Sequence, residues 1–179
     1  MKINESARYF FIIMFILLVL FFLVMYFEFG RISREDADRN IKNVLYSIGR
    51  YDWFVENGIE VIYTDDKTYS MVESKKLFIS LDTSRLEFRD NFIFELGHFV
   101  YSFEWCPLVN EKYNSYLVCE ARRIMPREVL FISCIRSHIF ADEFRRSGGR
   151  LQYNYDLFNR ILNFTEDDVK FFSEGCLQF

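Results

Sequence analysis

A short stretch near the middle of the chain contains residue types that could hydrolyse a peptide bond with the help of a metal ion. It reads Phe94-Glu95-Leu96-Gly97-His98. In the zinc-peptidase motif H-E-x-x-H, two histidines one helical turn apart share the metal, and the glutamate beside the first one deprotonates the metal-bound water. Glu95 stands at the general-base position and His98 at the second ligand position, whereas Phe94 replaces the first ligand. The alternative is a structural pair between Glu95 and His98 at i,i+3 on a helix.

The elements around this stretch follow from local sequence signals. Ser84 and Glu87 form a capping-box pair, and apolar residues at helical spacing continue the helix to Phe103, with Pro107 ending the region. Three extended segments precede this helix, and the residues between them have turn composition. The segments are Ile59–Thr64, Thr68–Val72 and Leu77–Leu81. A small antiparallel meander is the simplest arrangement for them.

Further helices are expected on both sides of this region. Ser33 caps an amphipathic helix whose apolar stripe runs from Ala37 to Ile48, and Pro126 suits the first turn of a later helix. The helices expected after Pro107 cover Glu111–Ile124, Pro126–Phe144, Tyr153–Phe164 and Glu166–Phe172. The pattern therefore predicts one α+β domain, with a small three-stranded sheet followed by helices.

Residues 36–144 resemble the ImmA/IrrE family of zinc metallopeptidases. The family's order is a strand, an active helix ending in A-H-E-L-G-H, and a later helix ending in L-L-M-P. The matching segments here are Lys76–Ser80, Ser84–Val100 and Tyr113–Pro126, and the segment Ile139–Phe144 looks like the following helix. The resemblance implies a zincin-like fold in which the sheet packs against the helical part.

The resemblance also assigns a role to each position of the site. It makes Glu95 the general base and His98 a retained metal ligand, while the other two ligand positions fall on Phe94 and Tyr113. Neither of these side chains holds zinc, which in catalytic sites takes three protein ligands and a water. Glu111 is a possible substitute ligand, two positions before Tyr113. No cofactor is expected unless such substitutes complete the zinc site.

The leading functional hypothesis is therefore a non-catalytic binding or regulatory protein with a degenerate peptidase domain. The alternative is an active zinc endopeptidase that uses substitute ligands and cleaves a regulatory protein. The family implies roles in phage and mobile-element regulation, where active members cut repressor-type proteins. A formal net charge of −4 gives no electrostatic reason to expect nucleic acid, so the expected partner is a protein of unknown identity.

The N-terminal part of the sequence predicts a membrane anchor. Residues from Tyr9 to Phe27 carry no charge, and as a helix they would span about 28 Å. No small-residue cleavage site follows, so we expect an uncleaved transmembrane helix over residues 1–30 and a single domain over residues 31–179. The span itself could also be the working part, with the domain as its regulator.

The cysteines and the flanking charges bear on location. Cys106, Cys119, Cys134 and Cys176 lack C-x-x-C spacing, which favours reduced, buried thiols, although two disulfides in an exported domain are also compatible with four cysteines. Basic residues are more frequent after the apolar span than before it, which favours a cytoplasmic C-terminal domain. We therefore expect a single-pass membrane protein with its domain in the cytoplasm.

Overall fold

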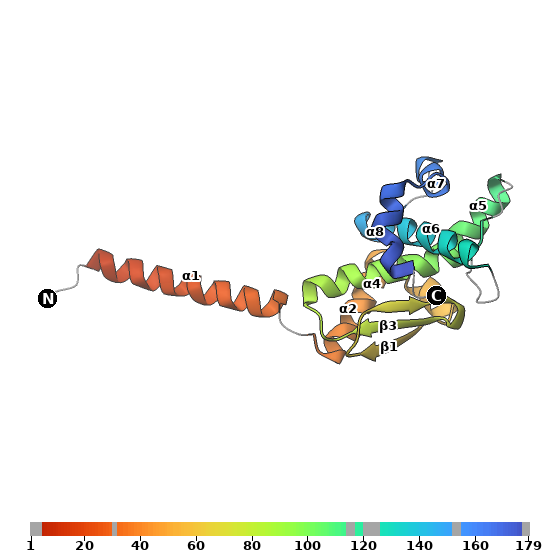
Figure 1. Cartoon of the computed structure of the whole chain (residues 1–179). Helices are drawn as coiled ribbons and strands as arrows, with labels where there is room; N and C mark the ends of the chain where they lie inside the picture. The colour runs from red at the N-terminus through yellow and green to blue at the C-terminus, as the bar shows by residue number, and fades with distance from the viewer. Residues whose placement is uncertain (1–4, 30–31, 114–116, 120–125, 152–154, 177–179) are drawn as a thin grey trace.

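The structure is a computed structural model, and it describes residues 5–29, 32–113, 117–119, 126–151 and 155–176. It is mostly helical with one small sheet (Figure 1). The α-helices are α1 Glu5–Phe29, α2 Arg34–Ser47, α3 Tyr51–Glu56, α4 Arg85–Val100, α5 Cys106–Tyr113, α6 Arg127–Arg146, α7 Tyr155–Leu162 and α8 Glu166–Cys176. The remaining elements are strands β1 Glu60–Thr64, β2 Tyr69–Met71 and β3 Lys76–Ser80, the 3₁₀ turn η1 Val72–Ser74 and the π-helical turn η2 Tyr101–Trp105.

The sheet is mixed, so the predicted antiparallel meander is wrong. Its strand order is β1-β3-β2, with β3 parallel to β1 and antiparallel to β2. The physical reason is burial. Leu77 and Ile79 of β3 are fully buried, whereas Tyr69 and Met71 of the three-residue strand β2 are exposed. The most buried strand therefore takes the centre of the sheet and the short exposed strand takes an edge.

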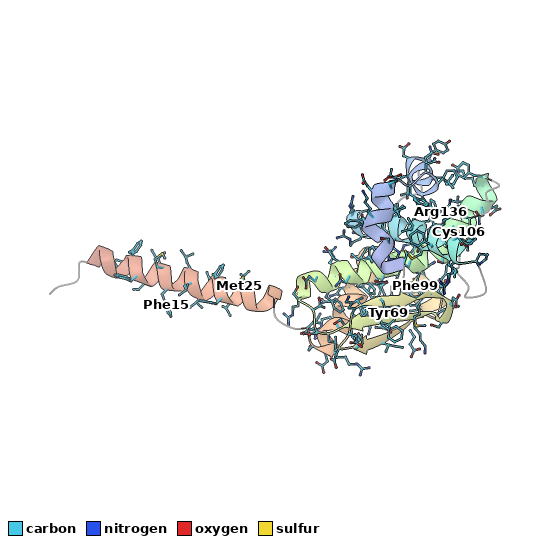
Figure 2. All side chains as sticks on the ribbon, in the orientation of Figure 1. Phe15, Met25, Tyr69, Phe99, Cys106 and Arg136 are labelled. Atoms are coloured by element: carbon cyan, nitrogen blue, oxygen red, sulfur yellow. A yellow bond between two sulfur atoms is a disulfide. The ribbon has the colours of Figure 1, made fainter. Side chains whose placement is uncertain are left out.

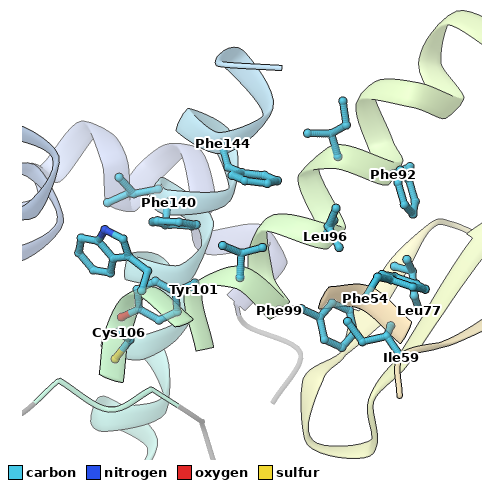
Figure 3. Close-up of a cluster of buried hydrophobic side chains, with 14 of the residues drawn as sticks. Phe54, Ile59, Leu77, Phe92, Leu96, Phe99, Tyr101, Cys106, Phe140 and Phe144 are labelled. Carbon is cyan, nitrogen blue, oxygen red and sulfur yellow. The ribbon is translucent and has the colours of Figure 1, made fainter. Parts of the chain in front are cut away.

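Helix α4 lies between the sheet and α6 and forms the centre of the fold. Its predicted capping box is confirmed, because the Ser84 hydroxyl accepts from the Glu87 backbone and the Glu87 carboxylate accepts from the Ser84 backbone. Phe92, Leu96 and Phe99 are completely buried along this helix (Figure 3). Helix α4 is thus part of the core, and its polar side chains can reach solvent or polar partners only where the packing leaves room for them.

The helices after Pro107 differ in part from expectation. Pro107 does not end the helical region but lies in the first turn of α5, where its missing N–H is tolerated. Helix α6 starts directly after Pro126, and α7 and α8 lie where two closing helices were expected. Of the helix predicted over Glu111–Ile124, residues 111–113 belong to the end of α5 and residues 114–116 and 120–125 lie outside the described residues. Residues 117–119 are described and are not helical, so the prediction is wrong there.

The N-terminal apolar segment is a helix, as predicted, but the membrane prediction is corrected. In the described part of the chain, no helix combines the length and the apolarity that crossing a membrane requires. The side chains that the structure describes in α1 run from Tyr9 to Met25. All of them are exposed, and Figure 2 shows Phe15 and Met25 on this helix. The predicted transmembrane anchor and single-pass location are not retained.

The cysteines form two disulfides, so the expectation of reduced thiols is also wrong. Cys106 pairs with Cys119, and Cys134 pairs with Cys176. The first bond ties α5 to the described residues 117–119, and the second ties α6 to the last turn of α8. Spacing in sequence cannot reveal such pairs, because the fold decides which cysteines come within about 6 Å of each other.

Candidate functional site beside helix α4

A polar cleft of about 510 Å³ lies where the sheet meets α4. The loop after β1, the end of β3 and one face of α4 form its walls. Its lining residues are Asp65, Asp66, Lys67, Thr68, Ser80, Asp82, Thr83, Asn91, Phe94 and Glu95. The Ser80 amide donates to the Thr68 hydroxyl at 3.0 Å and so joins two of these walls, and the Asp82 amide donates to the Ser80 hydroxyl at 3.2 Å within one of them. The cleft is therefore a shaped site at the carboxyl ends of β1 and β3.

Glu95 is the residue of the cleft whose protonation is most perturbed. Burial raises the pKa of its carboxyl from the ordinary 4.5 to about 7. The Ser70 hydroxyl donates a 2.7 Å hydrogen bond to Glu95 Oε2, which acts in the opposite direction and lowers the pKa. Burial outweighs the hydrogen bond. Glu95 can therefore exchange a proton near neutral pH, and a nearby positive charge would shift it to the carboxylate form.

The charge of the lining favours a cationic ligand. Its carboxylates are Asp65, Asp66, Asp82 and Glu95, and they face a single lysine among the lining residues, Lys67. Asp65, Asp66 and Asp82 are exposed and Glu95 is half-buried, and carboxylates grouped along one cleft raise the local concentration of positive groups. A positively charged group therefore matches this lining in charge.

His98 follows Glu95 by three residues on α4 but contacts α6 instead of the sheet. It is buried, and its Nδ1 lies 2.7 Å from the Ser137 hydroxyl on α6. Burial first, and the neighbouring His138 second, lower the pKa of His98 well below its ordinary value. The expected local pair between Glu95 and His98 is therefore wrong, because Glu95 bonds to Ser70 on the sheet and His98 to Ser137 on α6.

Phe94 occupies space beside the two histidines. Its ring meets the His98 ring edge-on at 5.2 Å between centroids and the His138 ring at 5.8 Å, and the two histidine rings are 4.7 Å apart. As expected for i and i+4 on a helix, the Phe94 and His98 rings meet. The structure thus brings the first two ligand positions together, with an aromatic ring at one of them.

The remaining predicted site residues lie on α5. Tyr113 stacks on Phe158 of α7 with ring centroids 4.5 Å apart, and Glu111 is exposed. Tyr113 therefore contributes to the packing of α5 against α7, whereas Phe94 and His98 face α6. For Glu111 to act as a substitute metal ligand, its side chain would have to leave the exposed side of α5.

Sequence reasoning missed two sets of residues. One is Ser70, which nothing in the sequence pairs with Glu95. The other is a group of three side chains within the described ranges, Cys134, His138 and Cys176, whose possible ligand atoms all lie within 4.8 Å of one another. The C-x-x-x-H spacing on α6 was a usable signal, because residues four apart on a helix share a face. The third member, on α8, could not be found from spacing.

Comparison with known proteins gives no relative from which a function could be taken. No protein family, no curated protein and no solved structure matches the chain.

Proposed function

We propose that this chain is a non-catalytic binding protein whose cleft beside α4 receives a basic side chain of a protein partner. The scaffold in this proposal is of the ImmA/IrrE type, with its metal site lost. The observation that carries the proposal is the position of Phe94, whose ring contacts both His98 and His138 where a metal ligand would be needed.

The loss of the metal changes what Glu95 can do. Without a metal ion, a water molecule keeps a pKa far above neutrality. A carboxylate whose pKa is about 7 is then too weak a base to generate hydroxide from it. Glu95 is left as a half-buried acidic group in a carboxylate-lined cleft, which suits recognition of a cation.

The binding mode follows from the contact between the Ser70 hydroxyl and the Glu95 carboxylate at the cleft. The Ser70 hydroxyl donates to one carboxylate oxygen of Glu95, and a carboxylate can accept further hydrogen bonds, including one from an ammonium or guanidinium group. Binding of the cation would stabilise the carboxylate and lower the pKa of Glu95 from about 7. The affinity should therefore rise with pH between about 6 and 8.

Fluorescence polarisation with matched peptides tests this proposal. Peptides that differ only at one central residue, arginine, lysine, glutamine or glutamate, are titrated with the full-length protein at pH 6 and pH 8. We expect tighter binding of the arginine and lysine peptides, and tighter binding at pH 8. Glu95→Gln should weaken binding and remove the pH dependence. Glu73→Gln is the matched control, because Glu73 is exposed on η1 and does not line the cleft. Equal binding of all four peptides would contradict the proposal.

One observation favours the alternative of an active zinc endopeptidase. A half-buried carboxyl with a pKa of about 7 is what a general base requires at neutral pH. This alternative predicts cleavage of a protein substrate that stops on addition of a chelator and is lost in Glu95→Gln. An unchanged cleavage rate in that variant would exclude it.

The two disulfides support a location for the domain. Structural disulfides form and persist in oxidising environments, whereas cytosolic thiols are kept reduced. We infer that the protein works in an oxidising compartment.

A further inference from the structure

A sulfur and nitrogen cluster connects α6 to α8, and none of its three residues lines the cleft. Cys134 and His138 lie one turn apart on α6, and Cys176 lies in the last turn of α8. His138 Nδ1 is 3.4 Å from Cys134 Sγ and 3.7 Å from Cys176 Sγ. The two sulfurs are joined as a disulfide, and both cysteines are buried.

These distances match the ligand spacing of a tetrahedral zinc site. With Zn–S bonds of about 2.3 Å and Zn–N bonds of about 2.0 Å, neighbouring sulfur and nitrogen ligands are about 3.6 Å apart. Both sulfur–nitrogen distances lie within a few tenths of an ångström of this value. The sulfurs need only separate from bonding distance to about 3.8 Å. The cluster is therefore close to metal-binding geometry before any metal is present.

We propose that Cys134, Cys176 and His138 bind a soft divalent metal ion such as Zn²⁺ when the disulfide between the two cysteines is reduced. A dithiol supplies two electrons and two protons, becomes a disulfide itself and leaves two protein thiols. Zn²⁺ then replaces the two thiol protons, which are released to solvent. The Nδ1–H of His138, which donates to the Cys134 carbonyl at 3.0 Å, moves its proton to Nε2 so that Nδ1 can bind the metal.

The surroundings suit a site with three protein ligands. The ring of Phe172 lies 5.7 Å from that of His138, and the ring of Phe94 lies 5.8 Å from it, so aromatic side chains border the site. The imidazole of His98 is also near His138, and its Nδ1 lies at hydrogen-bond distance from the Ser137 hydroxyl. A small ligand such as water would complete the coordination.

The metal would keep the same connection that the disulfide makes. The disulfide joins α6 to α8 covalently through Cys134 and Cys176, and the metal would join the same two helices by coordination, with His138 as a further ligand. The end of α8 would then stay attached when the protein meets a reducing environment, and the metal content would depend on the redox state.

Cobalt titration of the full-length protein tests the proposal. The protein is reduced anaerobically with a phosphine, which takes up water oxygen and becomes the phosphine oxide, and excess reagent is removed. Co²⁺ is then added and the absorption spectrum is recorded. We expect an equimolar amount of Co²⁺ to bind with a thiolate-to-cobalt charge-transfer band, and Zn²⁺ to displace it. The oxidised protein should show no such band. Absence of the band in the reduced protein would overturn the proposal.

Two variants test which side chains bind the metal. His138→Gln keeps the disulfide and can therefore fold before reduction, and it should bind Co²⁺ about 100-fold more weakly. The double variant Cys106→Ala with Cys119→Ala removes the other cysteine pair and should keep the full cobalt spectrum. Equal cobalt binding by His138→Gln and the unchanged protein would also overturn the proposal. Loss of the band in the Cys106 and Cys119 variant would place the metal at that other cysteine pair and would overturn it too.

Discussion

Ser70 on the edge strand β2 donates a 2.7 Å hydrogen bond to the carboxylate of Glu95 on α4. This contact joins the sheet to the central helix at the cleft, across 25 residues of sequence. It also sets two effects against each other, because burial raises the pKa of Glu95 and the hydrogen bond lowers it. The result, a pKa of about 7, shows that burial is the larger effect.

The first prediction concerns stability and pH. A carboxyl with a pKa of 4.5 in the unfolded chain and about 7 in the folded chain takes up a proton on folding between these values. Its stabilising contribution is therefore complete below pH 4.5 and is lost as the pH rises through 7. The shift corresponds to at most about 3 kcal/mol, and contact with solvent in the cleft reduces this to about 1–2 kcal/mol. Urea unfolding of the unchanged protein and of Glu95→Gln from pH 4.5 to 8 measures the difference.

The control for this experiment is Glu73→Gln, whose stability should follow that of the unchanged protein at every pH. Glutamine at position 95 accepts the same hydrogen bond from Ser70 and carries no charge at any pH, so its profile should lack the loss. Parallel profiles for Glu95→Gln and the unchanged protein would show that the pKa of Glu95 is not raised.

The second prediction concerns the contact between α4 and α6. A Cβ atom at Gly97 would lie 2.8 Å from the Ala141 Cα and 3.1 Å from its Cβ, and a backbone atom cannot turn aside as a flexible side chain can. Gly97→Ala should lower the free energy of unfolding by about 1–3 kcal/mol, although alanine favours helix by about 1 kcal/mol. Arg89→Ala, on an exposed position of α4, is the control and should change stability by less than about 0.5 kcal/mol. A stabilising effect of Gly97→Ala would show that α4 and α6 lie farther apart at Gly97 than these distances state.

The third prediction concerns the two disulfides. Cys134 and Cys176 are 42 residues apart, and Cys106 and Cys119 are 13 apart. The chain-entropy model assigns about 4 kcal/mol to the longer loop and about 3 kcal/mol to the shorter one. Replacing Cys134 and Cys176 by alanines should therefore destabilise the protein more than replacing Cys106 and Cys119. Urea unfolding without reductant measures both, and a thiol assay in denaturant should find no free thiol in the unchanged protein. If all four cysteines of the unchanged protein reacted as free thiols in that assay, both pairings would be refuted.

The fourth prediction concerns the lost metal ligand. Phe94 already contacts the rings of His98 and His138, so Phe94→His should bring three imidazoles together and let the oxidised protein retain zinc through gel filtration. Adding Tyr113→Glu should give no further gain, because Tyr113 packs on Phe158 of α7. Phe103→His, on η2, is the control and should retain no zinc. Failure of Phe94→His to bind zinc would contradict the placement of these rings, and a clear gain from Tyr113→Glu would contradict the placement of α5.

Much of the local structure could be predicted from the sequence. The capping box at Ser84 and Glu87, the start of α6 after Pro126 and the helical N-terminal segment depend on neighbouring residues, and the structure contains all three. Glu95 and the pair formed by Phe94 and His98 were identified for the same reason, since helical spacing alone brings positions 94 and 98 together.

Tertiary structure alone decided the pairings between distant residues. The order of the sheet, the bond from Ser70 to Glu95, and the partners of the four cysteines each join segments that no local pattern connects. Periodicity shows which face of an element is buried, but not which other element covers it. For this reason the sequence by itself determined the central helix and the positions of Phe94, Glu95 and His98 on it, whereas packing decided that Glu95 lines a cleft, that His98 faces α6, and that two cysteines meet at His138.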